Sequence, residues 1–219
     1  MTAAAPACRI VGVFIGGPKD MRDADGEWRS SIARDPVVGP AVLETRGFVG
    51  DKATQSYHGH PDSAVCLHLL THYQFWNTNY GLSLRPGAVG ENLTLDTWDD
   101  STICAGDIFR IGSARLQISG PRTPCENQAR RVGVANWIEL TLHEARTGLY
   151  ARVLTPGSLQ TGDEVTLDHR PNPSLTIESL TRCYFQEFNP ALAEQFTRAE
   201  GLMPWWQERF ARRIAEQAA

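Results

Sequence analysis

The 219-residue chain lacks several patterns that would assign it to a common class. No apolar run approaches the length of a membrane span, and no G-x-G-x-x-G, Walker A or G-x-S-x-G motif is present. Lysine is scarce, because only Lys19 and Lys52 accompany the arginines among the 21 basic residues. We favour codon bias as the cause over a need for phosphate-binding guanidinium groups. The net charge of −4 favours neither nucleic acid nor an anionic membrane as the main partner.

Cysteine pairs are also missing, since the five cysteines include no C-x-x-C motif. The first eight residues have neither the basic nor the apolar region of a signal peptide. We therefore expect a cytoplasmic protein with free thiols rather than a disulfide framework. Cys66 and Cys104 lie in or beside apolar runs and are assigned to the core, whereas Cys8 and Cys183 give no signal.

Short β segments separated by Gly, Pro and Asp turns dominate residues 8–168 and predict a β-barrel or sandwich with some helix. The expected strands are Arg9–Ile15, Ala64–Leu69, Asn92–Leu95, Asp107–Ile111, Arg115–Ser119, Leu149–Leu154 and Glu164–Leu167. Helices are expected at about 70–79 and 135–145. The segment from Pro18 to Pro40, which is rich in Asp, Gly, Arg and Ser, is interpreted as a long surface loop.

The pattern changes to a period of 3.6 after the Pro-rich linker at residues 168–173. Three short amphipathic helices are expected, so the chain divides into a β domain (1–168) and a helical domain (171–219). Asn189–Pro190 predicts a helix start. Arg209, Arg212 and Arg213 form a basic face on the last helix, which is most often a solvated face and less often a docking patch. Trp205 and Trp206 beside it could be core, or could contact an electron donor or a second copy of the chain, as a homodimer.

The stretch Thr123–Pro124–Cys125–Glu126 follows an expected strand and opens a short helix. It matches a capping box with Thr at N-cap, Pro at N1 and Glu at N3, which places Cys125 at N2. The free backbone N–H groups there, together with Arg122, favour thiolate over thiol. A buried structural cysteine on a tight turn is the competing interpretation. The polar residues around Cys125 favour a reactive one.

Four segments resemble the MOSC domain family, named after the C-terminal domain of molybdenum cofactor sulfurase. Pro121–Cys125 resembles the PRxPC motif, and Tyr57–Val65 the HGGPDxAV segment. Gly90–Leu93 and Gly106–Gly112 resemble the GENL and GDxxRIG segments. The helical tail is similar to the three-alpha domain of the YiiM-type bacterial branch, described as N-hydroxylaminopurine resistance proteins. Departures from the HGG segment occur at His60 and Ser63.

The resemblance implies a MOSC-type β-barrel that binds the molybdenum cofactor (molybdopterin). Cys125 would be the catalytic residue and molybdenum ligand. The residues implied to line the pterin and its phosphate are His58, Gly59, Glu91, Asn92, Arg122 and Asn127. The activity implied is reduction of N-hydroxylated small molecules, such as N-hydroxylaminopurine, to amines, with electrons from a separate donor protein. The resemblance also implies an association with pyridoxal phosphate binding.

Other functions stay open. Cys125 could carry a persulfide for sulfur transfer, although the chain has no cysteine desulfurase domain, or the protein could be a non-catalytic cofactor carrier. His58-x-His60 and His68-x-x-x-His72 have spacings that zinc sites use, but no third ligand of convincing spacing appears, so structural zinc is not expected.

Overall fold

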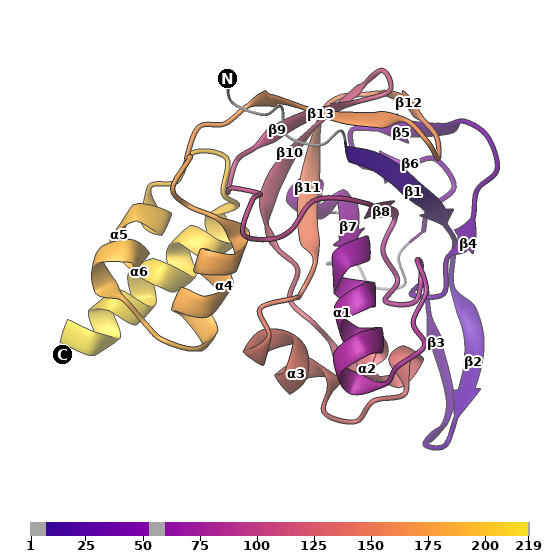
Figure 1. Ribbon diagram of the computed structural model, residues 1–219, viewed down its shortest axis with the longest axis horizontal. Coiled ribbons are helices and arrows are strands. Elements are labelled where there is room, and N and C mark those ends of the chain that lie inside the picture. The colour runs from indigo at the N-terminus through magenta and orange to yellow at the C-terminus, as the bar shows by residue number, and fades with distance from the viewer. Residues whose placement is uncertain (1–7, 53–59, 219) are drawn as a thin grey trace.

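The barrel expected from the sequence is the centre of the fold (Figure 1). The computed structural model describes residues 8–52 and 60–218. Seven strands form one closed sheet in the order β13–β9–β10–β11–β7–β8–β1, and β1 pairs with β13 to close it. These strands are β1 Cys8–Ile15, β7 Val65–Leu69, β8 Leu93–Leu95, β9 Ile108–Ile111, β10 Ala114–Pro121, β11 Leu149–Thr155 and β13 Glu164–His169. Closure leaves no unpaired edge that would recruit another chain.

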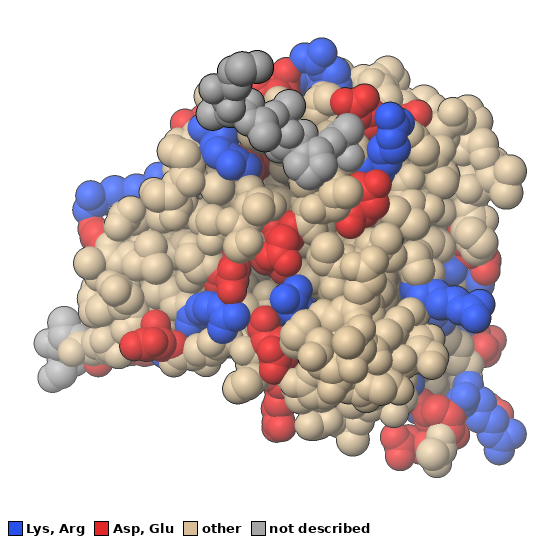
Figure 2. Space-filling model, viewed as in Figure 1, with Lys and Arg blue, Asp and Glu red and all other residues tan. Residues whose placement is uncertain are grey.

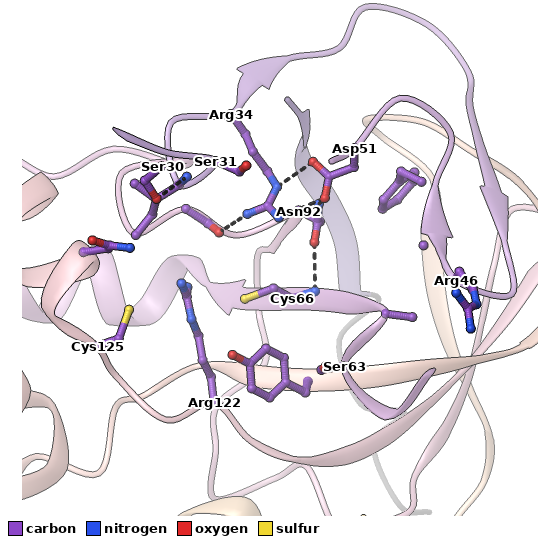
Figure 3. Close-up of a pocket in the computed structure, with 17 residues that line it drawn as sticks. Ser30, Ser31, Arg34, Arg46, Asp51, Ser63, Cys66, Asn92, Arg122 and Cys125 are labelled. Carbon is purple, nitrogen blue, oxygen red and sulfur yellow. Dashed lines mark hydrogen bonds and ion pairs between the residues drawn. The ribbon is translucent and has the colours of Figure 1, made fainter. Parts of the chain in front are cut away.

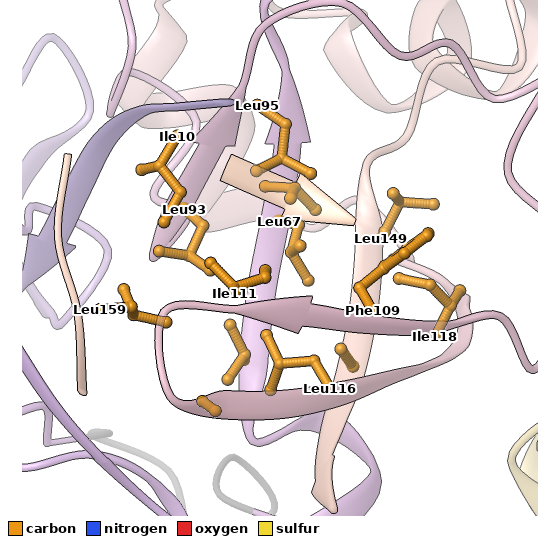
Figure 4. Close-up of a cluster of buried hydrophobic side chains, with 14 of the residues drawn as sticks. Ile10, Leu67, Leu93, Leu95, Phe109, Ile111, Leu116, Ile118, Leu149 and Leu159 are labelled. Carbon is orange, nitrogen blue, oxygen red and sulfur yellow. The ribbon is translucent and has the colours of Figure 1, made fainter. Parts of the chain in front are cut away.

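Alternation along each strand divides barrel interior from barrel exterior. In β7, Val65, Leu67 and Leu69 belong to the interior core, whereas Cys66 and His68 project to the opposite face. Figure 4 shows the interior, where leucine and isoleucine side chains from several strands meet, with Phe109 beside Leu149 and Ile118. Neighbouring strands are antiparallel except β7 and β8, which are parallel. Cys66 and His68 are nevertheless buried, so other elements cover the exterior of β7.

Helices cover part of the barrel. They are α1 Leu70–Tyr80, α2 Glu126–Val132, α3 Trp137–His143, α4 Ile177–Phe185, α5 Pro190–Thr197 and α6 Pro204–Ala218. Helices α1 to α3 pack around a second core that contains Trp76 and Trp137. No helix in the described part of the chain is long and apolar enough to cross a membrane. All seven expected strands and all expected helices are present, with ends shifted by a few residues.

The C-terminal helices pack directly against the barrel instead of standing apart. Their core includes Ala105 from the barrel and is contacted by Tyr150 of β11. Arg170, in the expected linker, donates two hydrogen bonds to the fully buried Asp107 carboxylate. As predicted, Asn189 caps α5 by accepting a hydrogen bond from the Leu192 N–H. The helical region is thus continuous in packing with the strands that it covers.

The prediction of a long surface loop between Pro18 and Pro40 is wrong. This segment forms a hairpin of β2 Lys19–Asp23 and β3 Gly26–Ser30, followed by the short β4 Asp35–Pro36. Gly26 adopts φ +111°, a conformation that suits glycine in a tight turn. The hairpin is polar on its exposed face, so its composition resembles that of a loop. Further short strands, β5 Ala41–Glu44, β6 Gly47–Phe48 and β12 Gly157–Leu159, form a separate small sheet.

Candidate functional site

A pocket opens on the exterior of the barrel, beside the outward face of β7 (Figure 3). Its cavity volume is about 120 Å3, and the pocket opens to solvent. Its wall combines β6, β7 and β11 with the segments that follow β3 and β10 and with the start of α2. Polar groups converge there from positions far apart in the sequence.

Cys125 lies on this wall and is partly exposed. It is the N-cap residue of α2, with φ −141° and ψ 166°, and no side chain caps the helix. The predicted capping box is therefore wrong, because Pro124 stays outside the helix and the helix begins one residue after the cysteine. The thiol nevertheless faces the pocket. The other four cysteines are buried, and all five are free thiols, as expected.

Arg122 reaches the same pocket and is only 7% exposed. One of its guanidinium N–H groups donates to the Val89 carbonyl at 2.8 Å. Within the described residues, Arg122 forms no ion pair with a carboxylate. Burial lowers the pKa of Arg122, but the neighbouring Cys66, Tyr150 and Cys125 raise it above its ordinary value. A buried guanidinium that stays charged and lacks a carboxylate partner favours an anionic ligand.

A second arginine in the pocket is neutralised. Arg34 donates to both oxygens of Asp51, each at 2.8 Å, and also to the Gly90 carbonyl. Asn92 donates to the same Asp51 carboxylate at 3.0 Å and accepts from the Cys66 N–H at 3.0 Å. Asn92 thus fixes the pocket wall by tying β7 to the loop that holds Asp51. Its predicted place at the pocket agrees with the structure.

Glu91 lies behind the pocket wall rather than on it. The side chain is fully buried, and one carboxylate oxygen accepts from the Tyr73 hydroxyl, the Gly87 N–H and the Thr94 hydroxyl. These contacts hold the turn before β8 in place. The sequence pattern places Glu91 beside Asn92, but in the structure only Asn92 lines the pocket.

The other residues that the sequence offers for cofactor or metal binding lie in different parts of the structure. Asn127 lines the pocket with Cys125 and Arg122, while His58 and Gly59 lie outside the described residues. His68 and His72 are buried neighbours with ring centroids 4.8 Å apart, and His72 contacts Asp100. No group of three metal-binding side chains with suitable geometry occurs in residues 8–52 and 60–218.

Among the pocket residues that were not predicted, two carry an acidic proton. Cys66, assigned to the core, is buried but lines the pocket, and burial raises the pKa of its thiol. Tyr150 of β11 lines the pocket as well, and burial is the main cause that raises its pKa to about 12. Both alternate with interior residues of their strands, so strand periodicity was a usable signal.

The helical region packs against the end of β10, which leads into the site. The Trp206 indole N–H donates to the Pro121 carbonyl, and the Met203 N–H donates to the Ser119 carbonyl. Gly120, with φ +147°, has no room for a side chain, because a Cβ there would lie 2.6 Å from the Trp206 ring. This close contact fixes the backbone that leads into Arg122 and Cys125.

The predicted basic face on α6 is only partly solvated. Arg209 stacks over the rings of Tyr184 and Trp205, while Arg213 stacks over Tyr184 and Phe188. Trp206 is core and Trp205 is 43% exposed. On the molecular face in Figure 2, basic and acidic side chains are interspersed among uncharged ones.

Comparisons with known proteins agree with this architecture. The family model of the MOSC domain matches residues 54–166. Protein YiiM of Escherichia coli is 29% identical over 189 residues, which cover 84% of each chain. A reductase of Gibberella moniliformis is 31% identical over 161 residues, 72% of this chain but only 29% of that longer protein. The crystal structure of YiiM from Geobacillus stearothermophilus superimposes with a TM-score of 0.79 and 27% identity, covering 94% of this chain and 99% of that one.

Proposed function

Because the chain belongs to the MOSC domain family, we propose that this pocket holds a molybdenum–pterin cofactor and that the protein reduces N-hydroxylated compounds to amines. The observation that carries the proposal is a buried, unneutralised Arg122 guanidinium in the same pocket as the accessible Cys125 thiol. A soft metal favours a thiolate ligand, and an anionic phosphate favours a guanidinium. The residues present therefore fit the cofactor.

The residues have separate roles in this proposal. Cys125 would bind molybdenum, while Arg122, Asn92 and Asn127 would hold the pterin and its phosphate. When bound, the cofactor supplies a redox-active metal that passes electron pairs to the substrate. A separate donor protein would deliver those electrons. Trp206 and Gly120 keep the backbone before Arg122 rigid, so the thiol and the guanidinium retain their relative positions.

The proposal is tested by turnover of cofactor-loaded protein. With reduced methyl viologen as electron donor, 6-N-hydroxylaminopurine should be converted to adenine as the viologen is oxidised. Protein that is replete in molybdenum and pterin but produces no adenine would contradict the reductase and favour a cofactor carrier. Cyanide-releasable sulfur on Cys125 without turnover would instead favour the persulfide alternative.

Arg122→Lys should weaken cofactor retention by about tenfold or more. Lysine keeps the charge but cannot reproduce a planar, bidentate contact with phosphate, and it also cannot satisfy Val89 in the same geometry. The rate of cofactor loss on dilution, followed by the fluorescence of the released and oxidised pterin, measures this. An unchanged rate would show that Arg122 does not bind the cofactor and contributes only to the backbone turn that leads to Cys125. Arg46→Lys is a control at the exposed rim of the same pocket.

A further inference from the structure

Tyr150 contacts the core of the C-terminal helices and also places a phenol on the pocket wall. The residue belongs to β11, where Leu149 and Ala151 fill the barrel interior and Tyr150 faces outward. Arg122 lines the same pocket, and its positive charge opposes the rise in the Tyr150 pKa that burial causes. Within the described residues the phenol hydroxyl is not donated to any protein group, so its proton is available to a bound molecule.

Other described proton donors in the pocket are already committed. The Asp51 carboxylate is held by Arg34, Asn92 and the Gly16 N–H. Cys66 is a buried thiol, and Cys125 is the proposed metal ligand. Serine hydroxyls are much weaker acids than a phenol. Cys66 is buried, whereas Tyr150 is partly exposed, so Tyr150 is the accessible acidic group of the described wall that is neither bonded to a carboxylate nor assigned to the metal.

We propose that Tyr150 is the proton donor to the departing hydroxyl group of the substrate. This inference rests on the proposed reductase function. The reaction R–NH–OH plus two electrons and two protons gives R–NH2 plus water, with the electrons supplied by the reduced cofactor. As the N–O bond breaks, the phenol proton moves to the oxygen, which leaves as water. The phenolate is stabilised by Arg122 and regains a proton from solvent, while the second proton reaches the nitrogen from water.

The energetics suit this role. Hydroxide is a strongly basic leaving group, so the oxygen becomes a better base than phenolate during cleavage and proton transfer is downhill. The adjacent Arg122 cation offsets the cost of a buried phenolate. A positioned acid of this kind accelerates cleavage by roughly 10² to 10⁴-fold.

The test compares two leaving groups in Tyr150→Phe, which keeps the ring and removes only the hydroxyl. Turnover of an N-hydroxylamine should fall by about 10²-fold or more. Turnover of its O-acetyl derivative should hardly change, because acetate leaves without a proton. Molybdenum and pterin content and the melting temperature should stay at wild-type values. Tyr80→Phe is the matched control, since its hydroxyl bonds Glu144 on the surface.

Each other outcome overturns the inference. Full activity on the N-hydroxylamine shows that the phenol donates no proton. Equal loss on both substrates assigns Tyr150 to substrate placement. Loss of molybdenum assigns the hydroxyl to cofactor retention. If the wild-type enzyme turns over neither substrate, the reductase proposal itself is contradicted. That result differs from every outcome that concerns Tyr150 alone.

Discussion

Cys125→Ser should abolish reductase activity, with a loss of at least about 10³-fold, and should release most of the molybdenum. A serine hydroxyl is a hard, weakly acidic ligand, whereas a thiolate is soft and matches the metal. The fold should be kept, because Cys125 is an N-cap residue with extended backbone and serine is among the preferred N-caps. Metal analysis, viologen-linked turnover and the melting temperature measure the three effects separately.

Cys104→Ser is the matched control. Cys104 is 1% exposed in the core between barrel and helical region and lies outside the pocket. Burying a hydroxyl there should lower the free energy of unfolding by about 1–3 kcal/mol while turnover per bound molybdenum stays unchanged. A Cys125→Ser protein that retains both its metal and its activity would remove Cys125 from the site.

Trp206→Ala should have the largest effect on stability. The side chain is 1% exposed, contacts Tyr184, Phe185 and Phe210, and bonds the Pro121 carbonyl. Truncation of a buried tryptophan costs about 3–5 kcal/mol, a large fraction of the stability of a typical domain. Because the indole also supports the backbone before Arg122, protein that still folds should lose cofactor faster. Urea unfolding and the pterin release rate measure the two effects.

Trp205→Ala is its neighbour and control. Trp205 is 43% exposed, so its removal should cost less than about 1 kcal/mol and leave cofactor retention unchanged. Equal stability of the two variants would show that the helical region does not brace the site.

We propose that the chain divides into residues 1–168 and 171–219. Both parts contribute to one packed interface.

Much of the barrel was predictable because its signals are local. Alternation in segments such as Arg115–Ser119 identifies strands, and the 3.6 period after residue 173 identifies helices. The Asn189–Pro190 helix start was equally readable. The polar β2–β3 hairpin was missed because its strands have little apolar alternation, and its pairing depends on turn geometry and cross-strand contacts such as Arg29 with Asp20.

The site was predictable only in part. Cys125 and Arg122 stand in a recognisable motif, and the structure places both in one pocket. The capping box failed because the N-cap is Cys125, with extended backbone, and the helix starts at Glu126. Arg34 and Asp51 reach the pocket through long-range contacts, which one sequence does not reveal. Trp206 beneath Gly120 is likewise a tertiary contact without a local signal.

The most direct test of the central claim is the cofactor content of protein purified from a host supplied with molybdate. Molybdenum would be measured by mass spectrometry and pterin by the fluorescence of its oxidised form, each against chain concentration. The proposed site predicts equimolar molybdenum, pterin and chain in the wild-type protein. Wild-type protein that carries neither molybdenum nor pterin under these conditions would contradict it.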